Sequence, residues 1–320
     1  MSLLTFNNVE RYFPVAKGVL RRKAFAYVRA VDGVSFQVEP GKTFALVGES
    51  GCGKTTIAKL ALRLDVPTGG EIAFRGRNAF AMTDEEQREF RANVQAVFQD
   101  PTSSLNPRHR VSTIVTEPLV INRNVTKEAA RTAAMDALRE VGLSENAIDR
   151  FPHEFSGGQR QRIAIARALV LKPSLIVLDE AVSALDVSIQ AQVMNLLQDL
   201  QHKHHLAYLF IAHNLGIVRQ ASDRVGVMYL GRIVEQGPTE QVFSRRAHPY
   251  TRALIGASLP PDPVAARAAA IIQGEVPSAI ALPKGCRFAS RCPMAADICR
   301  EIDPPEKQVG EAHSAACHFA

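Results

Sequence analysis

A glycine-rich loop between an apolar run and a helix-forming segment carries the clearest chemistry in this sequence. The apolar run spans residues 44–47, the loop GESGCGKT spans residues 48–55, and the letters TIAKLALRL follow. Glycines let backbone amides turn inward around a phosphate, and a helix start adds partial positive charge. Lys54 is placed to bridge the β- and γ-oxygens of a nucleotide, and the Thr55 hydroxyl to hold magnesium. The predicted nucleotide contacts are Gly48, Glu49, Ser50, Gly51, Cys52, Gly53, Lys54, Thr55 and Thr56.

Two acids indicate what happens to the bound nucleotide. Residues 175–178 form a continuous apolar run, typical of a buried strand, and Asp179 and Glu180 follow it. Phosphate ligands bind at the carboxyl edge of an α/β sheet. We therefore expect Asp179 to support magnesium and Glu180 to polarise the water that attacks the γ-phosphate. Acid pairs are also common in ordinary turns, so this assignment depends on the glycine loop.

Length and composition describe the scaffold that must position these groups. The chain has 320 residues, of which 46% are hydrophobic and 22% are charged. These proportions exclude a fibre or a disordered chain, and the length suits about two domains. No apolar stretch is long enough to span a bilayer, and the start lacks a secretion signal. We expect a folded protein that remains in the cytoplasm.

The net charge of +6 suits nucleotide phosphates, anionic lipid or nucleic acid, and does not choose among them. The sequence contains no tryptophan, and nothing interleaves aromatics with bases as in single-strand binders, so nucleic-acid binding is a minority hypothesis. A basic cluster near the start is either a solvated loop or a patch that faces phosphate or lipid. Its members are Arg11, Lys17, Arg21, Arg22, Lys23 and Arg29.

The hydrophobic pattern divides the chain into three parts. Short β-type runs fill residues 3–80, with Thr68, Gly69 and Gly70 as a hairpin signal before EIAF. A helical period follows over residues 83–154, and then the apolar runs LIVL, AYLFIA and RVGVMYL alternate with helical segments. We predict an α/β domain over residues 1–258, with a helical insert at about residues 99–154. A small extension would occupy residues 259–320.

A second predicted helix start that contains glycines lies at Ser156, Gly157, Gly158 and Gln159, before the helical run IAIARALVL. Its hydroxyl and amides form another anion site, and one nucleotide does not readily occupy both sites. The motif resembles the signature of the ATP-binding cassette (ABC) family. The resemblance implies a cassette with a mixed sheet, an antiparallel β subdomain and a helical insert. It also implies two cassettes packed head to tail, each signature closing over the γ-phosphate held by the other chain.

Three further positions carry the same resemblance in the family's order. Gln99 resembles the loop glutamine that meets magnesium and water, Asp186 lies in a segment that resembles the loop through which two cassettes touch, and His213 resembles the switch histidine at the γ-phosphate. The implied catalytic residues are Glu180, His213 and Gln99, and the implied magnesium ligands are Thr55, Gln99 and Asp179.

Adenine requires an apolar face, which in this family is an aromatic side chain of the first hairpin. Tyr12 and Phe13 are the candidates, with Tyr27 as a rival because residues 14–25 resemble an insertion. The alternative is that all three rings only pack within strands.

Peripheral segments narrow the family resemblance. PTSSLNPR at residues 101–108, YLGRIVE at 229–235 and HPYT at 248–251 resemble the peptide and nickel importer branch. The chain is most similar to the second ATPase subunit of bacterial dipeptide and oligopeptide importers. That resemblance implies ATP hydrolysis at the cytoplasmic face of the inner membrane, energising peptide uptake. Nickel, glutathione or opine import, and a soluble ABC ATPase acting on nucleic acid, remain alternatives.

The same resemblance implies several partners. These are a second, different ATPase subunit, two membrane permeases and, indirectly, an extracytoplasmic solute-binding protein. Nucleic acid is not among them, because an ABC ATPase of that class normally has a coiled-coil insert or two cassettes in one chain.

Four cysteines crowd the last 35 residues: Cys286, Cys292, Cys299 and Cys317. The gaps between them contain five, six and seventeen residues, unlike the short gaps of common zinc modules. Relatives in this branch that carry a [4Fe-4S] cluster here imply the same for this chain, and four thiolates also suit zinc. The alternative is reduced, buried thiols. His313 and His318 are weaker ligand candidates.

Overall fold

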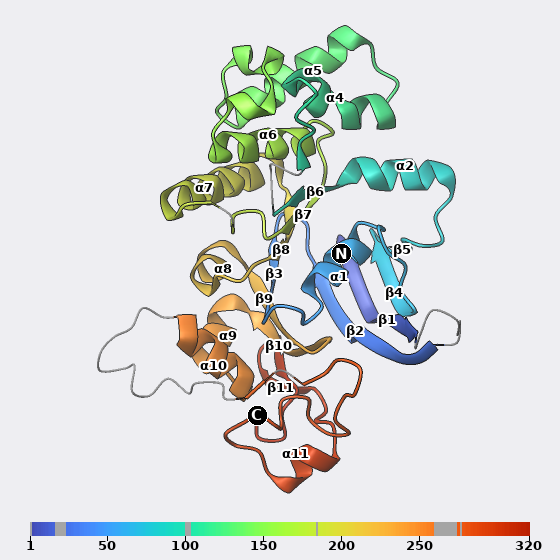
Figure 1. Ribbon diagram of the computed structural model, residues 1–320, viewed down its shortest axis with the longest axis vertical. Coiled ribbons are helices and arrows are strands. Elements are labelled where there is room, and N and C mark those ends of the chain that lie inside the picture. Colours follow the sequence, from blue (N-terminus) through green and yellow to red (C-terminus); the bar gives the residue numbers. More distant parts are fainter. Residues whose placement is uncertain (1, 17–23, 100–103, 184, 259–273, 276) are drawn as a thin grey trace. The chain divides into compact units, whose positions relative to one another are not determined.

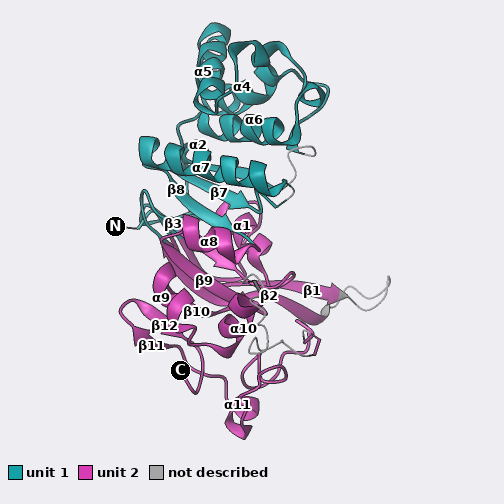
Figure 2. Ribbon diagram, turned by 90° about the vertical axis from the view of Figure 1, so that its left-hand side faces the viewer, with its two compact units in different colours: residues 1–4, 38–43, 73–212 teal, residues 5–37, 44–72, 213–320 magenta. Residues whose placement is uncertain are grey.

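The computed structural model describes residues 2–16, 24–99, 104–183, 185–258, 274–275 and 277–320. Contacts divide the chain into two compact units, each assembled from separated segments (Figure 2). Unit 1 comprises residues 1–4, 38–43 and 73–212, and unit 2 comprises residues 5–37, 44–72 and 213–320. The phosphate loop and the C-terminal cysteines therefore belong to one unit, and the two acids to the other.

Three parallel strands form the sheet of unit 1: β6 (Val94–Phe98), β7 (Leu175–Asp179) and β8 (Ala207–Ile211). β7 lies between the other two, and residues 175–178 are buried, which explains their unbroken apolar run. Phe98 and Ile211 both pair with Asp179. Since parallel strands end at the same edge, the residues after these strands emerge side by side.

Helices make up most of the rest of unit 1 (Figure 1). They are α2 (Asp84–Asn93), α4 (Val111–Asn122), α5 (Lys127–Glu140), η1 (Glu145–Asp149), η2 (Pro152–Glu154), α6 (Gly157–Leu169) and α7 (Val187–His204). α5 begins where the Thr126 side chain accepts the Ala129 N–H, and it buries Ala130, Ala134 and Leu138 against its neighbours α4 and α6. The helical period predicted over residues 83–154 is found in α2, α4 and α5, but the strand β6 interrupts it at residues 94–98.

A four-stranded sheet has the order β2-β1-β4-β5. Its strands are β1 (Leu4–Ala16), β2 (Ala24–Val38), β4 (Gly69–Phe74) and β5 (Arg77–Asn78). The hairpin expected at residues 68–70 is wrong. Gly70 has φ +74°, and a Cβ there would lie 2.1 Å from the Asn8 carbonyl oxygen, so this glycine allows β4 to approach β1 closely. The tight turn lies instead after β4, at Arg75 and Gly76 with φ of 50° and 77°.

Unit 2 contains a mixed sheet whose strands follow the order β11-β12-β10-β9-β3. β3 (Thr43–Val47) runs parallel to β9 (Arg224–Tyr229), and the remaining neighbours are antiparallel. β10 (Arg232–Pro238) pairs with β12 (His313–Ala315), which pairs with β11 (Lys307–Gly310), so the end of the chain extends the sheet. The helices are α1 (Lys54–Ala61), α8 (Leu215–Ala221), α9 (Thr239–Arg245), α10 (Pro249–Ser258) and α11 (Asp297–Glu301).

The predicted α/β class with a mixed sheet is confirmed, while the expected domain boundary at residues 258–259 adjoins residues outside the described part. Of the basic cluster, Arg11 pairs with Asp65 at 2.7 Å and Arg29 lies 3.9 Å from Asp32. Lys17, Arg21, Arg22 and Lys23 lie outside the described residues. Within the described ranges, no helix combines the length and apolar character that crossing a membrane requires.

Candidate nucleotide-binding site

The phosphate loop joins β3 to α1 in the predicted order of strand, loop and helix. Two of its glycines are required because the backbone of other strands lies against them. A Cβ on Gly48 would lie 2.1 Å from the Met228 carbonyl oxygen, and a Cβ on Gly53 would lie 2.1 Å from that of Ala30. Both glycines also have positive φ, 152° and 114°. The loop backbone therefore packs closely against β2 and β9, which restricts its conformation.

Lys54 lies along the inside of this loop. Its side chain is buried, and its ammonium donates to the carbonyl oxygens of Gly48 at 2.8 Å and Glu49 at 3.0 Å. Cys52 also points inward, and burial raises the pKa of its thiol, which argues against a nucleophile. By contrast, Ser50, Gly51 and Thr55 are exposed. The exposed face of the loop is thus the one available to a ligand.

The three candidate aromatic residues have different surroundings. The Tyr12 hydroxyl donates to Asp32, and the Arg29 guanidinium lies 5.5 Å from the Tyr12 ring centre. Burial and this hydrogen bond raise the pKa of Tyr12. The Phe13 ring lies under the Arg11 guanidinium at 4.5 Å, and Tyr27 is 52% exposed. Which ring faces adenine stays a prediction.

Glu180 occupies an unusual backbone conformation directly after β7. Its φ is +52°, which a residue with a side chain adopts at a cost of about 1–3 kcal/mol. The Glu180 N–H donates to the Ile211 carbonyl at 3.0 Å, and its carbonyl accepts the Ser183 hydroxyl at 2.9 Å. These bonds hold the turn, so the carboxylate leaves the strand in a fixed direction. Such strain is concentrated at functional sites.

Gln99 and His213 follow strands that end beside Glu180. β6 ends at Phe98, whose pairing with Asp179 places Gln99 next to the two acids in the sheet register. β8 ends at Ile211, also opposite Asp179, and the exposed His213 lies two residues further along the chain. Asn214 then begins α8, its side chain accepting the N–H groups of Gly216 and Ile217. Gln99 and Glu180, both in unit 1, therefore follow neighbouring strands at one sheet edge, whereas His213 is the first residue of a unit 2 segment.

The signature segment forms a complete helix start. The Ser156 hydroxyl accepts the Gln159 N–H at 3.3 Å, while the Gln159 side chain accepts the Ser156 N–H at 3.0 Å. This capping box uses the hydroxyl as an acceptor, and its proton remains able to donate. Gly157 and Gly158 open α6, and a Cβ on Gly158 would lie 2.6 Å from Cγ2 of Ile189 in α7. The glycine thus permits close packing of α6 on α7.

Asp186 lies exposed at the start of α7, and the next residue, Val187, is a hydrophobic side chain that is 83% exposed. A strongly exposed apolar residue at the first position of a helix is available for contact with another protein. Ala184, within the same predicted contact loop, lies outside the described residues.

Glu49 has two partners that the sequence analysis missed. Its N–H donates to the hydroxyl of the buried Tyr250 at 2.9 Å. Its carboxylate accepts two N–H groups of Arg291, at 2.9 and 3.2 Å. Tyr250 carried a weak signal as part of HPYT, but Arg291 carried none, because its contact spans 242 positions.

The expected iron–sulfur or zinc site is not supported. Among the described residues, which include all four C-terminal cysteines, no group of three or more histidine, cysteine, aspartate or glutamate side chains is arranged to hold a metal ion. The thiols are nevertheless near one another. Burial raises the pKa of Cys286 to about 11, and the other three cysteines add to this effect. None of these four cysteines forms a disulfide bond, and we derive no chemistry from a metal here.

The two tail histidines have other partners. His313 is fully buried and contacts the Glu235 carboxylate through Nε2 at 2.8 Å. His318 Nε2 lies 2.9 Å from the Ile302 carbonyl oxygen. Both expectations of metal ligation therefore lack support.

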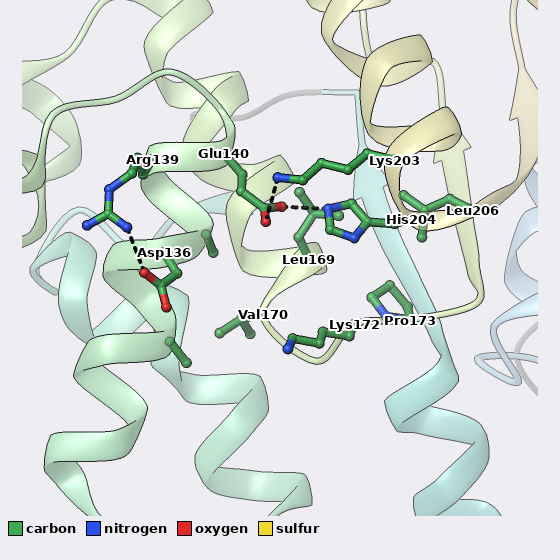
Figure 3. Close-up of a pocket in the computed structure, with 12 residues that line it drawn as sticks. Asp136, Arg139, Glu140, Leu169, Val170, Lys172, Pro173, Lys203, His204 and Leu206 are labelled. Atoms are coloured by element: carbon green, nitrogen blue, oxygen red, sulfur yellow. Dashed lines mark hydrogen bonds and ion pairs between the residues drawn. The ribbon is translucent and has the colours of Figure 1, made fainter.

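A cavity of about 420 Å³ lies in unit 1 between the ends of α5, α6 and α7 (Figure 3). Several of its charged side chains pair with one another. Glu140 accepts from Lys203 at 3.1 Å and contacts His204 at 2.7 Å, and Asp136 pairs with Arg139 at 2.8 Å. None of the predicted site residues lines it, and we do not assign it to nucleotide binding.

Two family models match the chain. The model described as "ABC transporter" matches residues 31–183, which include the phosphate loop, the signature and both acids. The model described as "Oligopeptide/dipeptide transporter, C-terminal region" matches residues 234–299, which include Glu235, Tyr250 and Arg291.

Individual relatives are similar over nearly the whole length. The chain is 47% identical to a probable peptide ABC transporter ATP-binding protein, y4tS, of Sinorhizobium fredii, covering 99% of this chain and 90% of the relative. It is 46% identical to the di/tripeptide transport ATP-binding protein DppF of Pseudomonas aeruginosa, covering 100% and 98%. A solved dimeric cassette, MJ0796, in a post-hydrolysis state with ADP and Pi, has a TM-score of 0.64 and 26% identity, covering 74% of this chain and 98% of that one.

Proposed function

The chain belongs to the ABC transporter family of ATPases, and from that membership we propose that it energises the uptake of dipeptides and oligopeptides through a membrane importer. The observation that carries the cargo assignment is that similarity to peptide transport proteins extends over both ends of the chain. The family model for the C-terminal region of oligopeptide and dipeptide transporters also matches this chain. A cassette match alone would leave the cargo open, because one fold serves many functions.

The roles of the site residues follow from their chemistry and placement. We assign the exposed face of the phosphate loop to the β- and γ-phosphates, with Lys54 moving from loop carbonyls to phosphate oxygens. Glu180 is the base that accepts a proton from the attacking water, and its strained, hydrogen-bonded turn supports that role. His213 would contact the γ-phosphate, and Gln99 would orient the water. Tyr12 or Phe13 would stack on adenine.

Magnesium fits the oxygen donors that the chain offers. The Thr55 hydroxyl, the Asp179 carboxylate and the Gln99 amide oxygen are hard ligands of the kind this ion prefers. When bound, the ion neutralises phosphate charge.

We propose that hydrolysis requires a second cassette. Ser156, Gly157, Gly158 and Gln159 form a helix start suited to an anion, which is a second such site beside the phosphate loop, and one nucleotide does not readily occupy both. The solved cassette that binds ADP and Pi is dimeric, which supports a pair of cassettes. Exposed Val187 beside Asp186 supports a contact at that loop. The partner would be a different ATPase subunit.

The same proposal places the protein at the cytoplasmic face of the inner membrane, bound to two permeases, with a solute-binding protein acting on the outer side. Apolar side chains at the end of α4 support a permease contact, since Val120 is 59% and Ile121 is 73% exposed. Movement of the helical insert would carry ATP-driven closure to the permeases.

The decisive experiment reconstitutes the chain with its permeases and partner ATPase in vesicles. We expect ATP-dependent accumulation of labelled di- and tripeptides. Glu180→Gln should reduce turnover by about 10²- to 10⁴-fold while ATP remains bound. Glu85→Gln, which alters an exposed acid in α2, is the matched control and should transport normally. Uptake of nickel but not peptides would refute the cargo assignment, and normal turnover in Glu180→Gln would refute the base.

A further inference from the structure

Glu49 places a carboxylate in a loop that must accept a polyanion. Glu49 itself is only part-buried. Both terminal nitrogens of Arg291 donate hydrogen bonds to this carboxylate, at 2.9 and 3.2 Å. The arginine side chain is only 8% exposed. Bidentate pairs of this kind are directional as well as strong. The negative charge of the loop is therefore balanced by a cation from a segment 242 positions away.

The segment that carries Arg291 is held firmly in place. Phe288, 1% exposed, packs edge-on against Tyr229, with ring centres 5.3 Å apart, and at a tilt against Tyr250, with ring centres 5.4 Å apart. Arg287 donates to the Leu230 carbonyl and to Asp32. These contacts hold residues 286–292 against β9, α10 and Asp32, which also accepts a hydrogen bond from the Tyr12 hydroxyl. This packed segment thus holds Arg291 beside Glu49.

The backbone of Glu49 is restrained from the same side. Its N–H donates to the Tyr250 hydroxyl at 2.9 Å, and Tyr250 is fully buried in α10. This amide is committed to the protein, so phosphate must use amides later in the loop. The C-terminal region consequently controls both the charge and the conformation of the first residues of the phosphate loop.

We propose that Arg291 is a positioning residue through which the C-terminal region sets the affinity of the phosphate loop for nucleotide triphosphate. The proposal rests on the proposed nucleotide site. Removing the guanidinium would leave the Glu49 carboxylate uncompensated beside the bound phosphates, and repulsion grows with the charge of the ligand. Affinity should therefore fall more for ATP than for ADP, and salt should reduce the difference.

The test measures the Kd of ATP and ADP for the full chain at low and high salt. Arg291→Gln should weaken ATP binding by about tenfold and ADP binding by less. Arg291→Lys should restore part of the ATP affinity, because it keeps the charge but loses the bidentate geometry. The double variant Glu49→Gln with Arg291→Gln should recover most of the affinity, since it removes the carboxylate as well. Arg300→Gln, which alters an exposed arginine in α11, is the matched control.

The outcomes separate the two proposals. If the unaltered chain binds no ATP, the nucleotide site itself is wrong. If the unaltered chain binds ATP and Arg291→Gln binds it equally well, the role of Arg291 is refuted. If the double variant is as weak as Arg291→Gln, with equal losses for ATP and ADP, the arginine acts only through packing and the charge argument is refuted.

Discussion

Glu235 and His313 form a completely buried pair: Nε2 of the histidine lies 2.8 Å from the carboxylate, and neither side chain is exposed. The same carboxylate accepts the N–H groups of Ala247 at 2.9 Å and His248 at 2.8 Å. Glu235 therefore joins β10, the chain before α10 and the C-terminal strand β12. These connections support the region that delivers Tyr250 and Arg291 to the phosphate loop.

Glu235→Gln should destabilise unit 2 substantially. The amide nitrogen of glutamine cannot accept the hydrogen bonds that one carboxylate oxygen receives, and leaving a buried donor without a partner costs about 1–3 kcal/mol. Chemical denaturation followed by a C-terminal probe measures the loss. Glu240→Gln, at an exposed acid paired with Arg219, is the control. Equal stability of the two variants would contradict a central role for Glu235.

Acid should weaken the same region through His248. Burial lowers the pKa of His248 to about 3, and its Nδ1 accepts the Tyr250 N–H at 3.0 Å. The unfolded chain binds a proton near pH 6.5 and the folded chain does not, so stability is full above pH 6.5 and falls as pH drops toward 3. The slope is about 1.4 kcal/mol per pH unit. Denaturation midpoints across this range test it, and His248→Asn should flatten the dependence.

Gly53→Ala should abolish nucleotide binding. The added Cβ would lie 2.1 Å from the Ala30 carbonyl oxygen, so the loop must move away from β2. Gly76→Ala is the matched control, because Gly76 also has positive φ but nothing lies within 4 Å of its Cβ position. Fluorescent nucleotide titration distinguishes them. Similar nucleotide affinity in both variants would show that packing of the loop against β2 is not required for nucleotide binding.

Gly158→Ala should separate α6 from α7 and reduce ATP turnover more than ATP binding. Its Cβ would meet Ile189 Cγ2 at 2.6 Å, and overpacking typically costs about 1–3 kcal/mol. The double variant with Ile189→Ala removes the clashing methyl group and should restore turnover. Steady-state kinetics beside Kd measurements test this. Failure of the double variant to recover would indicate that Gly158 is needed for another reason.

Cys286 should react slowly with alkylating agents at neutral pH. Burial, with the neighbouring cysteines, raises the pKa of its thiol to about 11, so the reactive thiolate is scarce. Its alkylation rate should rise about tenfold per pH unit up to that value. Mass spectrometry of iodoacetamide-treated protein between pH 7 and pH 10 measures the rate. Rapid labelling of Cys286 at pH 7 would contradict the protonated state.

Local patterns predicted the elements that local interactions stabilise. The phosphate loop is one contiguous segment between β3 and α1, and the β7 strand is one buried run, so their order along the chain was sufficient to find them. α5 and α6 begin with side-chain caps that lie within three residues of the groups they satisfy. A short-range pattern was thus enough to locate these elements, although the phosphate loop also packs against the distant strands β2 and β9.

Tertiary structure decided what separated segments do to one another. Gly70 indicated a turn when considered locally, but the nearby Asn8 carbonyl makes it a close strand contact. His313 was a weaker metal-ligand candidate, but its Nε2 instead contacts Glu235, which lies 78 positions away in the sequence. Arg291 had no signal before folding placed it on Glu49. Such pairs depend on how whole elements pack, because a side chain's partner is set by the path of the chain in space and not by its neighbours in sequence.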